Sequence, residues 1–253
     1  MKKMEGKVII VTGGGKGIGF GIATAFAKEG ANLVLTGRTV ERLQNAKDKL
    51  EKEYGIKVLS IAADGGKEDD VKRAVAETIK EFGKIDCIIN NAQASASGVM
   101  LKDHTKADFD LAINTGLYGA FFYMRECYPY LKETKGCVIN FASGAGLAGR
   151  PGQSSYAAAK EGIRGLTRVA ATEWGPDGIR ANVVCPLAMT EQLAAWKESY
   201  PELYDATIKN IPLQRFADPE KDIGRICVFL ASDDAAYISG ETITAQGGSG
   251  LRP

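Results

Sequence analysis

The chain alternates short apolar runs with longer stretches in which apolar residues recur every three or four positions. The short runs have the length and the Val and Ile content typical of buried strands, and the longer stretches have helical periodicity. This alternation predicts repeated βαβ units, and therefore an α/β fold: a Rossmann-type, doubly wound parallel sheet with helices on both faces. The predicted strands are Lys7–Thr12, Asn32–Thr36, Lys57–Ile61, Ile85–Ile89, Cys137–Ala142, Arg180–Val184 and Thr242–Ala245.

The helical stretches carry apolar stripes that end at glycines. Ile18, Ile22 and Phe26 form the first stripe, and similar stripes end before Gly55 and Gly83. Glycine is the usual residue just beyond a helix, so these positions indicate helix ends. The same rhythm continues from the first residues to the last without a linker, and we therefore expect a single domain over residues 1–253.

One segment, 187–213, departs from this rhythm. Leu193, Trp196 and Tyr200 are spaced as on one face of a helix, and Pro201 interrupts the pattern. The spacing predicts one or two short helices with an aromatic face. Two interpretations are open: the face packs on the domain, or the segment is a lid that closes an apolar substrate pocket.

Composition and charge narrow the function classes. The chain is 45% hydrophobic and 25% charged, with 32 basic and 31 acidic residues and a net charge of +1. The charges are mixed along the sequence, so we expect neither nucleic acid nor a membrane surface as a partner. No apolar run is long enough for a signal peptide or a membrane span, and we expect a cytoplasmic protein.

Cysteine and histidine usage argues against a metal site. The five cysteines are scattered through apolar patterns, which is typical of reduced residues that pack in a core. We expect no disulfide framework and no bound metal. His104 is the only histidine, and we expect it in a loop or at a helix cap.

A glycine-rich loop follows the first predicted strand and opens the first helix. Glycines allow a tight turn and let the backbone approach a pyrophosphate, which helix N-terminal amides then bind. A flexible turn is the alternative, but the strand and helix on either side favour a dinucleotide site. Its candidate cofactor-binding residues are Gly13, Gly15, Lys16, Gly17, Ile18 and Gly19.

The end of the second strand favours NADP over NAD. A carboxylate here would bind the ribose 2′-hydroxyl of NAD, but the chain has Arg38, and no acid follows until Glu41. Arg38 and Lys16 offer two cations for the 2′-phosphate of NADP. The alternative is that Arg38 is a solvated surface residue.

Candidate chemistry follows the fifth predicted strand. Ser143 lies at its carboxyl end, where open α/β sheets bind ligands, and Tyr156 and Lys160 share one face of the next helix. A phenol has a pKa of about 10, and we expect the Lys160 ammonium to lower the pKa of Tyr156. Ser143 would then hold a substrate oxygen while Tyr156 exchanges a proton with it. An ordinary amphipathic helix is the alternative.

Together these motifs resemble the classical short-chain dehydrogenase/reductases over essentially the whole chain. The glycine loop, the Asn90-Asn91-Ala92 motif and the Ser143, Tyr156 and Lys160 pattern are similar to those of the family in order and spacing. Further positions match single family residues: Asp64 beside adenine, Asn114 in the active site, and Pro186 and Thr190 beside the nicotinamide.

The resemblance implies a role for each matched side chain. Tyr156 would be the general acid in reduction and the general base in oxidation. Lys160 would lower the pKa of Tyr156 and bind the nicotinamide ribose, Ser143 would polarise the carbonyl, and Asn114 would support a water-linked proton relay to Lys160. Asn114 as a helix-kink residue and Asp64 as a turn residue are the alternatives.

Four positions depart from the family pattern. Gln93 and Leu187 replace glycines that follow Asn-Asn-Ala and Pro186, and Gly65 replaces an apolar residue after Asp64. Gln246 replaces an aspartate before the last Gly-Gly pair. None of the four touches the proton-transfer group, but Gln93 and Leu187 lie where the cofactor would bind.

A narrower resemblance concerns the substrate. Asn90–Ser95, Tyr123–Leu131, Phe141–Gly146 and the closing Gly-Leu-Arg-Pro are similar to bacterial hydroxysteroid dehydrogenases that act on bile acids, the 12α-specific enzymes most of all. Small residues at 144–146 would leave room for a bulky ring system. The candidate substrate-binding residues are Gln93, Ser95, Ser143, Ala145, Leu187, Leu193, Trp196 and Tyr200.

We therefore expect reversible, NADP(H)-dependent oxidation of a secondary alcohol, with a hydroxysteroid as the small-molecule substrate. A general ketoreductase or 3-oxoacyl-thioester reductase is the alternative among enzymes, and an NADP-binding sensor or scaffold is the alternative outside them. The resemblance also implies a homotetramer, with helices near 112–132 and 153–174 at the interfaces and the tail 247–253 near a neighbouring pocket.

Overall fold

A computed structural model of the protein describes residues 2–250. It contains one seven-stranded sheet in the order β3-β2-β1-β4-β5-β6-β7, and every neighbouring pair is parallel. The strands are β1 (Val8–Thr12), β2 (Asn32–Gly37), β3 (Val58–Ala62), β4 (Cys87–Asn90), β5 (Cys137–Phe141), β6 (Arg180–Pro186) and β7 (Thr242–Ala245). All seven predicted strands are confirmed.

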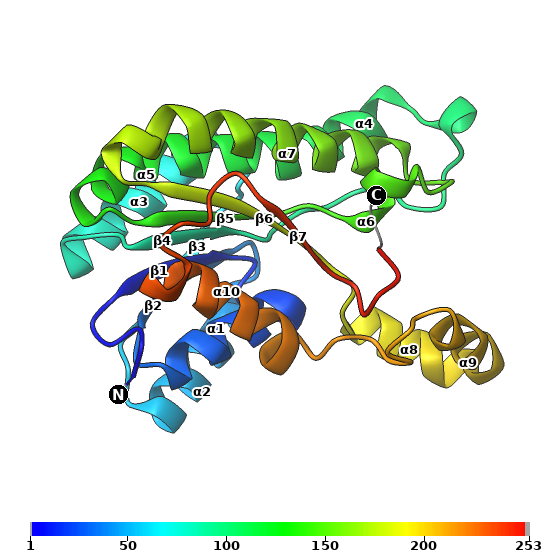
Figure 1. The fold of residues 1–253 in the computed structure, drawn as a ribbon, viewed down its shortest axis with the longest axis horizontal. Helices are drawn as coiled ribbons and strands as arrows, with labels where there is room; N and C mark the ends of the chain where they lie inside the picture. The colour runs from blue at the N-terminus through cyan, green and yellow to red at the C-terminus, as the bar shows by residue number, and fades with distance from the viewer. Residues whose placement is uncertain (1, 251–253) are drawn as a thin grey trace.

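The central strands are buried on both sides, which explains their continuous apolar sequence. In β1, Ile9 and Val11 point into the core on one side of the sheet, and Val8 and Ile10 point into the core on the other. Three helices cover the first side: α1 (Gly17–Lys28), α2 (Val40–Tyr54) and α10 (Arg225–Ala231). Three other helices cover the second (Figure 1): α3 (Glu68–Phe82), α5 (Gly119–Thr134) and α7 (Ser154–Trp174).

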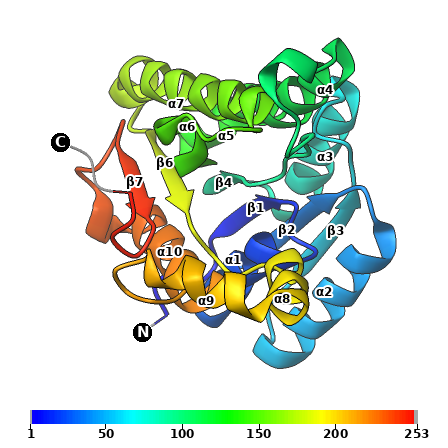
Figure 2. The same ribbon diagram turned by 90° about the vertical axis from the view of Figure 1, so that its right-hand side faces the viewer.

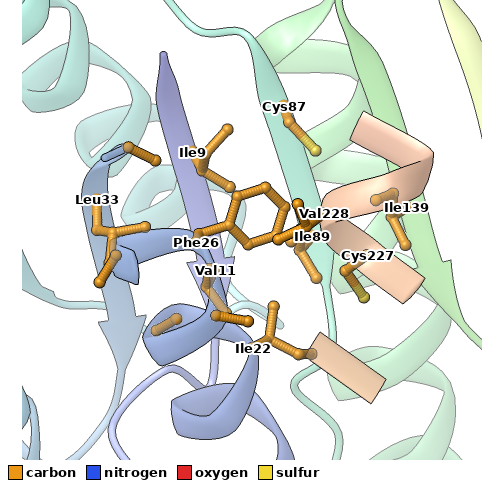
Figure 3. Packing of buried hydrophobic residues seen from close by; sticks show 14 of the residues in the cluster. Ile9, Val11, Ile22, Phe26, Leu33, Cys87, Ile89, Ile139, Cys227 and Val228 are labelled. Carbon is orange, nitrogen blue, oxygen red and sulfur yellow. The ribbon is translucent and has the colours of Figure 1, made fainter. Parts of the chain in front are cut away.

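The core on the α1 side fixes the helix that the glycine loop opens. Phe26 of α1 is fully buried and lies among Ile9 and Ile89 of the sheet and Val228 of α10 (Figure 3). Truncating such a side chain to alanine costs about 3–5 kcal/mol of stability in protein cores. The packing of Phe26 thus anchors α1, the helix that the glycine loop opens, against the sheet.

The expected helix over 112–132 is not continuous. The structure has α4 (Lys106–Ala112), a π-helical turn η2 (Ile113–Tyr118) and then α5. Apolar spacing shows the side of a helix that is buried, and it does not distinguish one π-turn from regular helix. Asn114 lies within this π-turn, so the alternative of a helix-kink residue describes its place in the backbone.

Three short helices gather at the carboxyl edge of the sheet: α6 (Gly144–Ala148), α8 (Glu191–Ser199) and α9 (Pro201–Lys209). Figure 2 shows α8 and α9 in front of this edge. Among residues 2–250, no helix has the length and apolar character needed to cross a membrane. The remaining turns are η1 (Leu101–Asp103), η3 (Gly175–Asp177), η4 (Pro219–Gly224) and η5 (Asp233–Ala235).

The five cysteines lie in the core of the protein. All five cysteines are free and buried, as their apolar surroundings in the sequence indicate. Within the described part of the chain, no group of three or more His, Cys, Asp or Glu side chains is arranged to hold a metal ion.

Candidate active site

The glycine loop has a backbone that requires glycine. Gly13 and Gly17 have φ angles of +68° and +53°, in the left-handed region. A Cβ on Gly19 would lie 2.3 Å from the carbonyl oxygen of Gly13. The loop therefore keeps an open concave backbone at the start of α1, which suits a pyrophosphate.

The segment after β4 lies directly beside this loop. The backbone N–H groups of Asn91 and Ala92 both donate to Thr12 Oγ1 at 3.0 Å, and Asn91 Nδ2 donates to the Thr12 carbonyl at 3.0 Å. A Cβ on Gly13 would meet Asn91 Nδ2 at 3.0 Å. The two motifs that were singled out in the sequence thus form one surface at the point where the strand order reverses, between β1 and β4.

This surface is one wall of a cavity of about 390 Å³. Most of the predicted cofactor residues line it, together with Gln93, which was predicted to contact substrate. The predicted residues in its lining are Gly13, Gly15, Lys16, Gly17, Ile18, Gly19, Arg38, Asp64, Asn91, Ala92 and Thr190. Pro186 lies nearby in the chain as the last residue of β6, and Ser143, Tyr156 and Lys160 are not part of this lining.

Three cations stand at the edge of this cavity. Lys16 and Arg38 were expected there, and Arg42 of α2 joins them. All three are exposed, and none forms a salt bridge within residues 2–250. Sequence analysis missed Arg42, although its position one helical turn after Arg38 was a usable signal. Asp64 is half-buried, and its Oδ1 accepts the backbone N–H of Gly66 at 3.1 Å, so it also closes a turn.

Ser143 follows β5 and caps the short helix α6. Its Oγ accepts the backbone N–H of Ala145 at 3.1 Å, which orients the hydroxyl at the carboxyl edge of the sheet. Ser95, in the loop after β4, has its hydroxyl 3.5 Å from that of Ser97.

Tyr156 and Lys160 lie on one side of α7, as their spacing predicts. Lys160 is buried, and its Nζ donates to the Phe141 carbonyl at 2.7 Å and lies 5.4 Å from the centre of the Tyr156 ring. Burial away from water lowers the pKa of Lys160 to about 7. An amine that titrates near neutrality inside an active-site wall is suited to proton exchange.

The expected lowering of the Tyr156 pKa is wrong for this structure. Burial raises the pKa of Tyr156, and the nearby Ser143 hydroxyl offsets only part of this shift. Burial also favours the neutral form of Lys160, which then has no charge to stabilise a phenolate. The four-residue spacing predicts that Lys160 lies beside Tyr156, but it does not show that both side chains are buried.

Asn114 is in the π-turn and is exposed. The π-turn packs against α7. Asn114 makes no hydrogen bond to Lys160 within the described residues, so the implied relay is not seen as a direct contact.

His104 joins the turn after η1 to the start of α7. Its ring nitrogens lie 3.0 Å from Ser154 Oγ and 2.9 Å from Ser155 Oγ, in the two residues before Tyr156. His104 directly follows η1, which confirms its expected place in a loop at a helix end. Its contact with α7 could not be predicted, because the two segments are distant in the sequence.

The 187–213 segment forms α8 and α9, which confirms two short helices. Trp196 lies 6.2 Å from Tyr204, and Tyr204 lies 5.8 Å from Phe216, between ring centres. Leu187 and Leu193 pack against the same cluster, which also contains Ile211. Tyr200 is 55% exposed and lies outside the cluster, between the two helices.

Two glycines after Ser143 lie against side chains of the protein itself. A Cβ on Gly144 would lie 2.3 Å from Nε2 of Gln246, and one on Gly146 would lie 2.8 Å from Oε1 of Glu161. Glycine at 144 and 146 therefore makes room for these two side chains. Gln246 is 8% exposed and is a packing residue here.

Comparison with known proteins gives the family. The family model described as enoyl-(acyl carrier protein) reductase matches residues 13–249. A 12α-hydroxysteroid dehydrogenase from Clostridium sp. (strain ATCC 29733 / VPI C48-50) is 64% identical over 255 residues, which cover 98% of each chain. The chain belongs to the short-chain dehydrogenase/reductase family.

Other members of the family show how broad the likeness is. The 3-oxoacyl-(acyl-carrier-protein) reductase FabG of Staphylococcus epidermidis is 35% identical and covers 96% of this chain and 98% of its own. The solved L-sorbose reductase of Gluconobacter frateurii, complexed with NADPH and L-sorbose, superimposes with a TM-score of 0.94 at 28% identity over all of both chains. The protein is thus an oxidoreductase that uses a nicotinamide cofactor and a small-molecule substrate.

Proposed function

We propose that the protein oxidises the 12α-hydroxyl of a bile-acid steroid reversibly, with NADP(H) as cofactor. The 64% identity with a 12α-hydroxysteroid dehydrogenase over nearly the whole chain carries this proposal. The clustering of Lys160 and Tyr156 with Ser143 at the carboxyl edge of the sheet supports the chemistry.

The side chains divide the proton chemistry between them. Ser143 donates a hydrogen bond to the substrate oxygen, and Tyr156 takes the hydroxyl proton in oxidation or returns it to the ketone oxygen in reduction. Lys160 holds the next proton, since its pKa of about 7 lets it gain or lose one near neutrality. Asn114 orders water between Lys160 and solvent. The bound cofactor supplies or accepts the hydride.

The residues at the cavity fit NADP. The open glycine backbone suits the pyrophosphate. Lys16, Arg38 and Arg42 form no salt bridge within residues 2–250, and the chain after β2 has no acid before Glu41. Titration of the purified protein with NADPH and with NADH tests this choice: we expect clearly tighter binding of NADPH, and equal affinity would contradict it.

We infer that the chain is one domain with a substrate lid at 187–213. Trp196 of α8 and Tyr204 of α9 pack with Ile211 and Phe216 in an apolar cluster. The partly exposed Leu193 and Trp196 at the border of this cluster would cover a steroid. Thr190, the N-cap of α8, lines the cofactor cavity, and so connects the lid to the cofactor.

The substrate is tested with bile acids that each carry one free hydroxyl, at carbon 3, 7 or 12. Nicotinamide absorbance is followed with NADP⁺ and each compound. We expect turnover confined to the 12-hydroxyl compound. Turnover at carbon 3 or 7 would show that the enzyme oxidises a hydroxyl other than the one at carbon 12. If NADPH instead reduces only an acetoacetyl thioester, the 3-oxoacyl-thioester reductase is favoured.

We also propose a homotetramer in the cytoplasm. Tyr118 and Val169, on η2 and α7, are 47% and 51% exposed and offer apolar contacts on the helices expected at the interface. The suggested role of the tail 247–253 lies partly outside the described residues. Light scattering coupled to gel filtration tests the assembly, and a monomeric mass would contradict it.

A further inference from the structure

Gln93 carries two polar atoms that the fold leaves unsatisfied. Its side-chain Oε1 and Nε2 are both buried, and neither has a hydrogen-bond partner within residues 2–250. Native proteins rarely bury an amide group in this way, because each unpaired atom keeps the cost of its lost hydration. The exceptions commonly mark a place where a bound molecule completes the hydrogen bonds.

The amide lies over a glycine of the π-turn. A Cβ on Gly116 would stand 2.7 Å from Cδ and 2.8 Å from Oε1 of Gln93, so no larger residue fits at 116 with Gln93 in place. The backbone beyond Gln93 is fixed, since Ala94 N–H donates to Thr115 Oγ1 at 2.9 Å and Thr115 Oγ1 donates to the Ala94 carbonyl at 3.0 Å. The backbone of Ala92 is bonded to β1. The side chain of Gln93 is the part that can move.

The position of Gln93 favours the cofactor as its ligand. Gln93 lines the cavity of the glycine loop together with Asp64 and Arg38. The neighbouring Ala92 Cα would be 3.4 Å from a Cβ on Gly13. The reacting side chains Ser143, Tyr156 and Lys160 do not line this cavity, so a substrate held by them is not the nearest partner.

A carboxamide offers a donor and an acceptor together, which is the pattern that a ribose hydroxyl needs. We propose that Gln93 binds a ribose hydroxyl of the bound nicotinamide cofactor, and that its amide turns away from Gly116 to do so. This rests on the proposed function. Gln93 is a candidate substrate-binding residue by sequence, at a position where the cofactor would bind, and the proposal gives its side chain a specific partner on the cofactor.

The substitution Gln93→Met separates ligand binding from packing. Methionine has a similar length and flexibility and no amide to leave unpaired. We expect the thermal midpoint of the cofactor-free protein to stay the same or rise. We expect the Kd for NADPH, measured by fluorescence titration, to rise about five- to tenfold, as for one lost hydrogen bond. Gln44→Met, on the exposed side of α2 and outside the cavity, is the matched control and changes neither value.

A second variant and a second ligand keep the test decisive. Gln93→Ala, titrated in parallel, serves if the methionine variant fails to fold. Weaker binding of 2′,5′-ADP as well as NADPH supports the adenosine ribose as the partner, and weaker binding of NADPH alone supports the nicotinamide ribose. An NADPH Kd within twofold of wild type in the folded variants overturns the proposal. If wild-type protein prefers NADH, the proposed cofactor choice fails separately, and the Gln93 comparison is made with NADH.

Discussion

The two ends of the adjacent strands β1 and β4 differ in how their polar groups are satisfied. At the amino ends, Asp86 is buried and pairs with Lys7 and Lys84, both at 3.1 Å, and accepts the Val8 N–H at 2.8 Å. At the carboxyl ends, the amide of Gln93 and the Oδ1 of Asn90 are buried without a hydrogen-bond partner in the described part of the chain.

This difference suggests that the amino edge of the sheet serves stability and that the carboxyl edge serves function. Unpaired buried groups cost about 1–3 kcal/mol each, so a fold does not keep them where packing alone decides. At the carboxyl edge the same region also holds Lys16, Arg38 and Arg42 outside any salt bridge within the described chain. The paired edge holds the sheet together, and the unpaired edge is the one prepared for ligands.

The largest effect is expected from Ser143→Ala at the carboxyl edge. Loss of the hydroxyl that holds the substrate oxygen lowers kcat by about 10²–10³-fold, as removal of one such donor does in other enzymes. Steady-state kinetics with a 12-hydroxy bile acid measure it. Ser143→Thr keeps the hydroxyl and serves as the control, and an active Ser143→Ala enzyme would remove Ser143 from the chemistry.

The second effect concerns the cations. Replacing both Arg38 and Arg42 with alanine removes hydrogen bonds made by exposed side chains, each of which is worth about 0.5–1.5 kcal/mol. The Kd for NADPH rises about 10- to 100-fold, and the Kd for NADH changes little. Parallel titrations measure both values. Equal losses for the two cofactors would show that the arginines do not bind the 2′-phosphate.

The third effect is a pH dependence of stability that arises from Lys160. Its pKa is about 7 in the folded protein, against about 10.4 in an unfolded chain. Between these values only the unfolded chain binds the proton, so stability rises with pH, by up to about 1.4 kcal/mol per pH unit. Burial raises the pKa of Tyr156, which opposes this trend only above about pH 10.

Urea unfolding at about pH 7, 8 and 9, at fixed protein concentration, measures this slope. Lys160→Met removes the titrating amine, and we expect the wild-type slope to exceed that of the variant. Identical slopes would mean that the buried amine does not lose its proton in this range.

The smallest effect on function is expected at the amino edge. Asp86→Asn breaks the pairs with Lys7 and Lys84, and lowers the free energy of unfolding by about 1–3 kcal/mol. The Kd for NADPH and kcat stay at their wild-type values, because no part of the cavity depends on Asp86. A large loss of cofactor affinity in this variant would contradict the statement that the amino edge of the sheet contributes to stability and not to cofactor binding.

Much of the fold follows from local pattern. The strands were predictable because a buried parallel strand needs a continuous apolar run, as in Val8–Thr12, and the glycine loop because positive φ angles need glycine at Gly13 and Gly17. The π-turn at Asn114 was not, because one extra residue in a helical turn leaves the apolar spacing nearly unchanged.

The residues of the candidate site could be predicted from the sequence, but the burial of their side chains and its effect on their pKa values could not. Spacing placed Tyr156 and Lys160 together, but it could not show that burial raises one pKa and lowers the other. The contacts of Phe216 with Tyr204 of α9 and of Gln246 with Gly144 join distant parts of the chain, and no local pattern encodes them.

We propose that Tyr156 transfers the proton while NADP(H) carries the hydride at the carboxyl edge of the sheet. The most direct measurement compares wild type and Tyr156→Phe in NADP⁺-dependent oxidation of a bile acid with a single 12α-hydroxyl, alongside the Kd for NADPH. We predict turnover in the wild type, a loss of about 10²–10⁴-fold in the variant, and unchanged cofactor affinity. Equal turnover in both proteins would contradict the account.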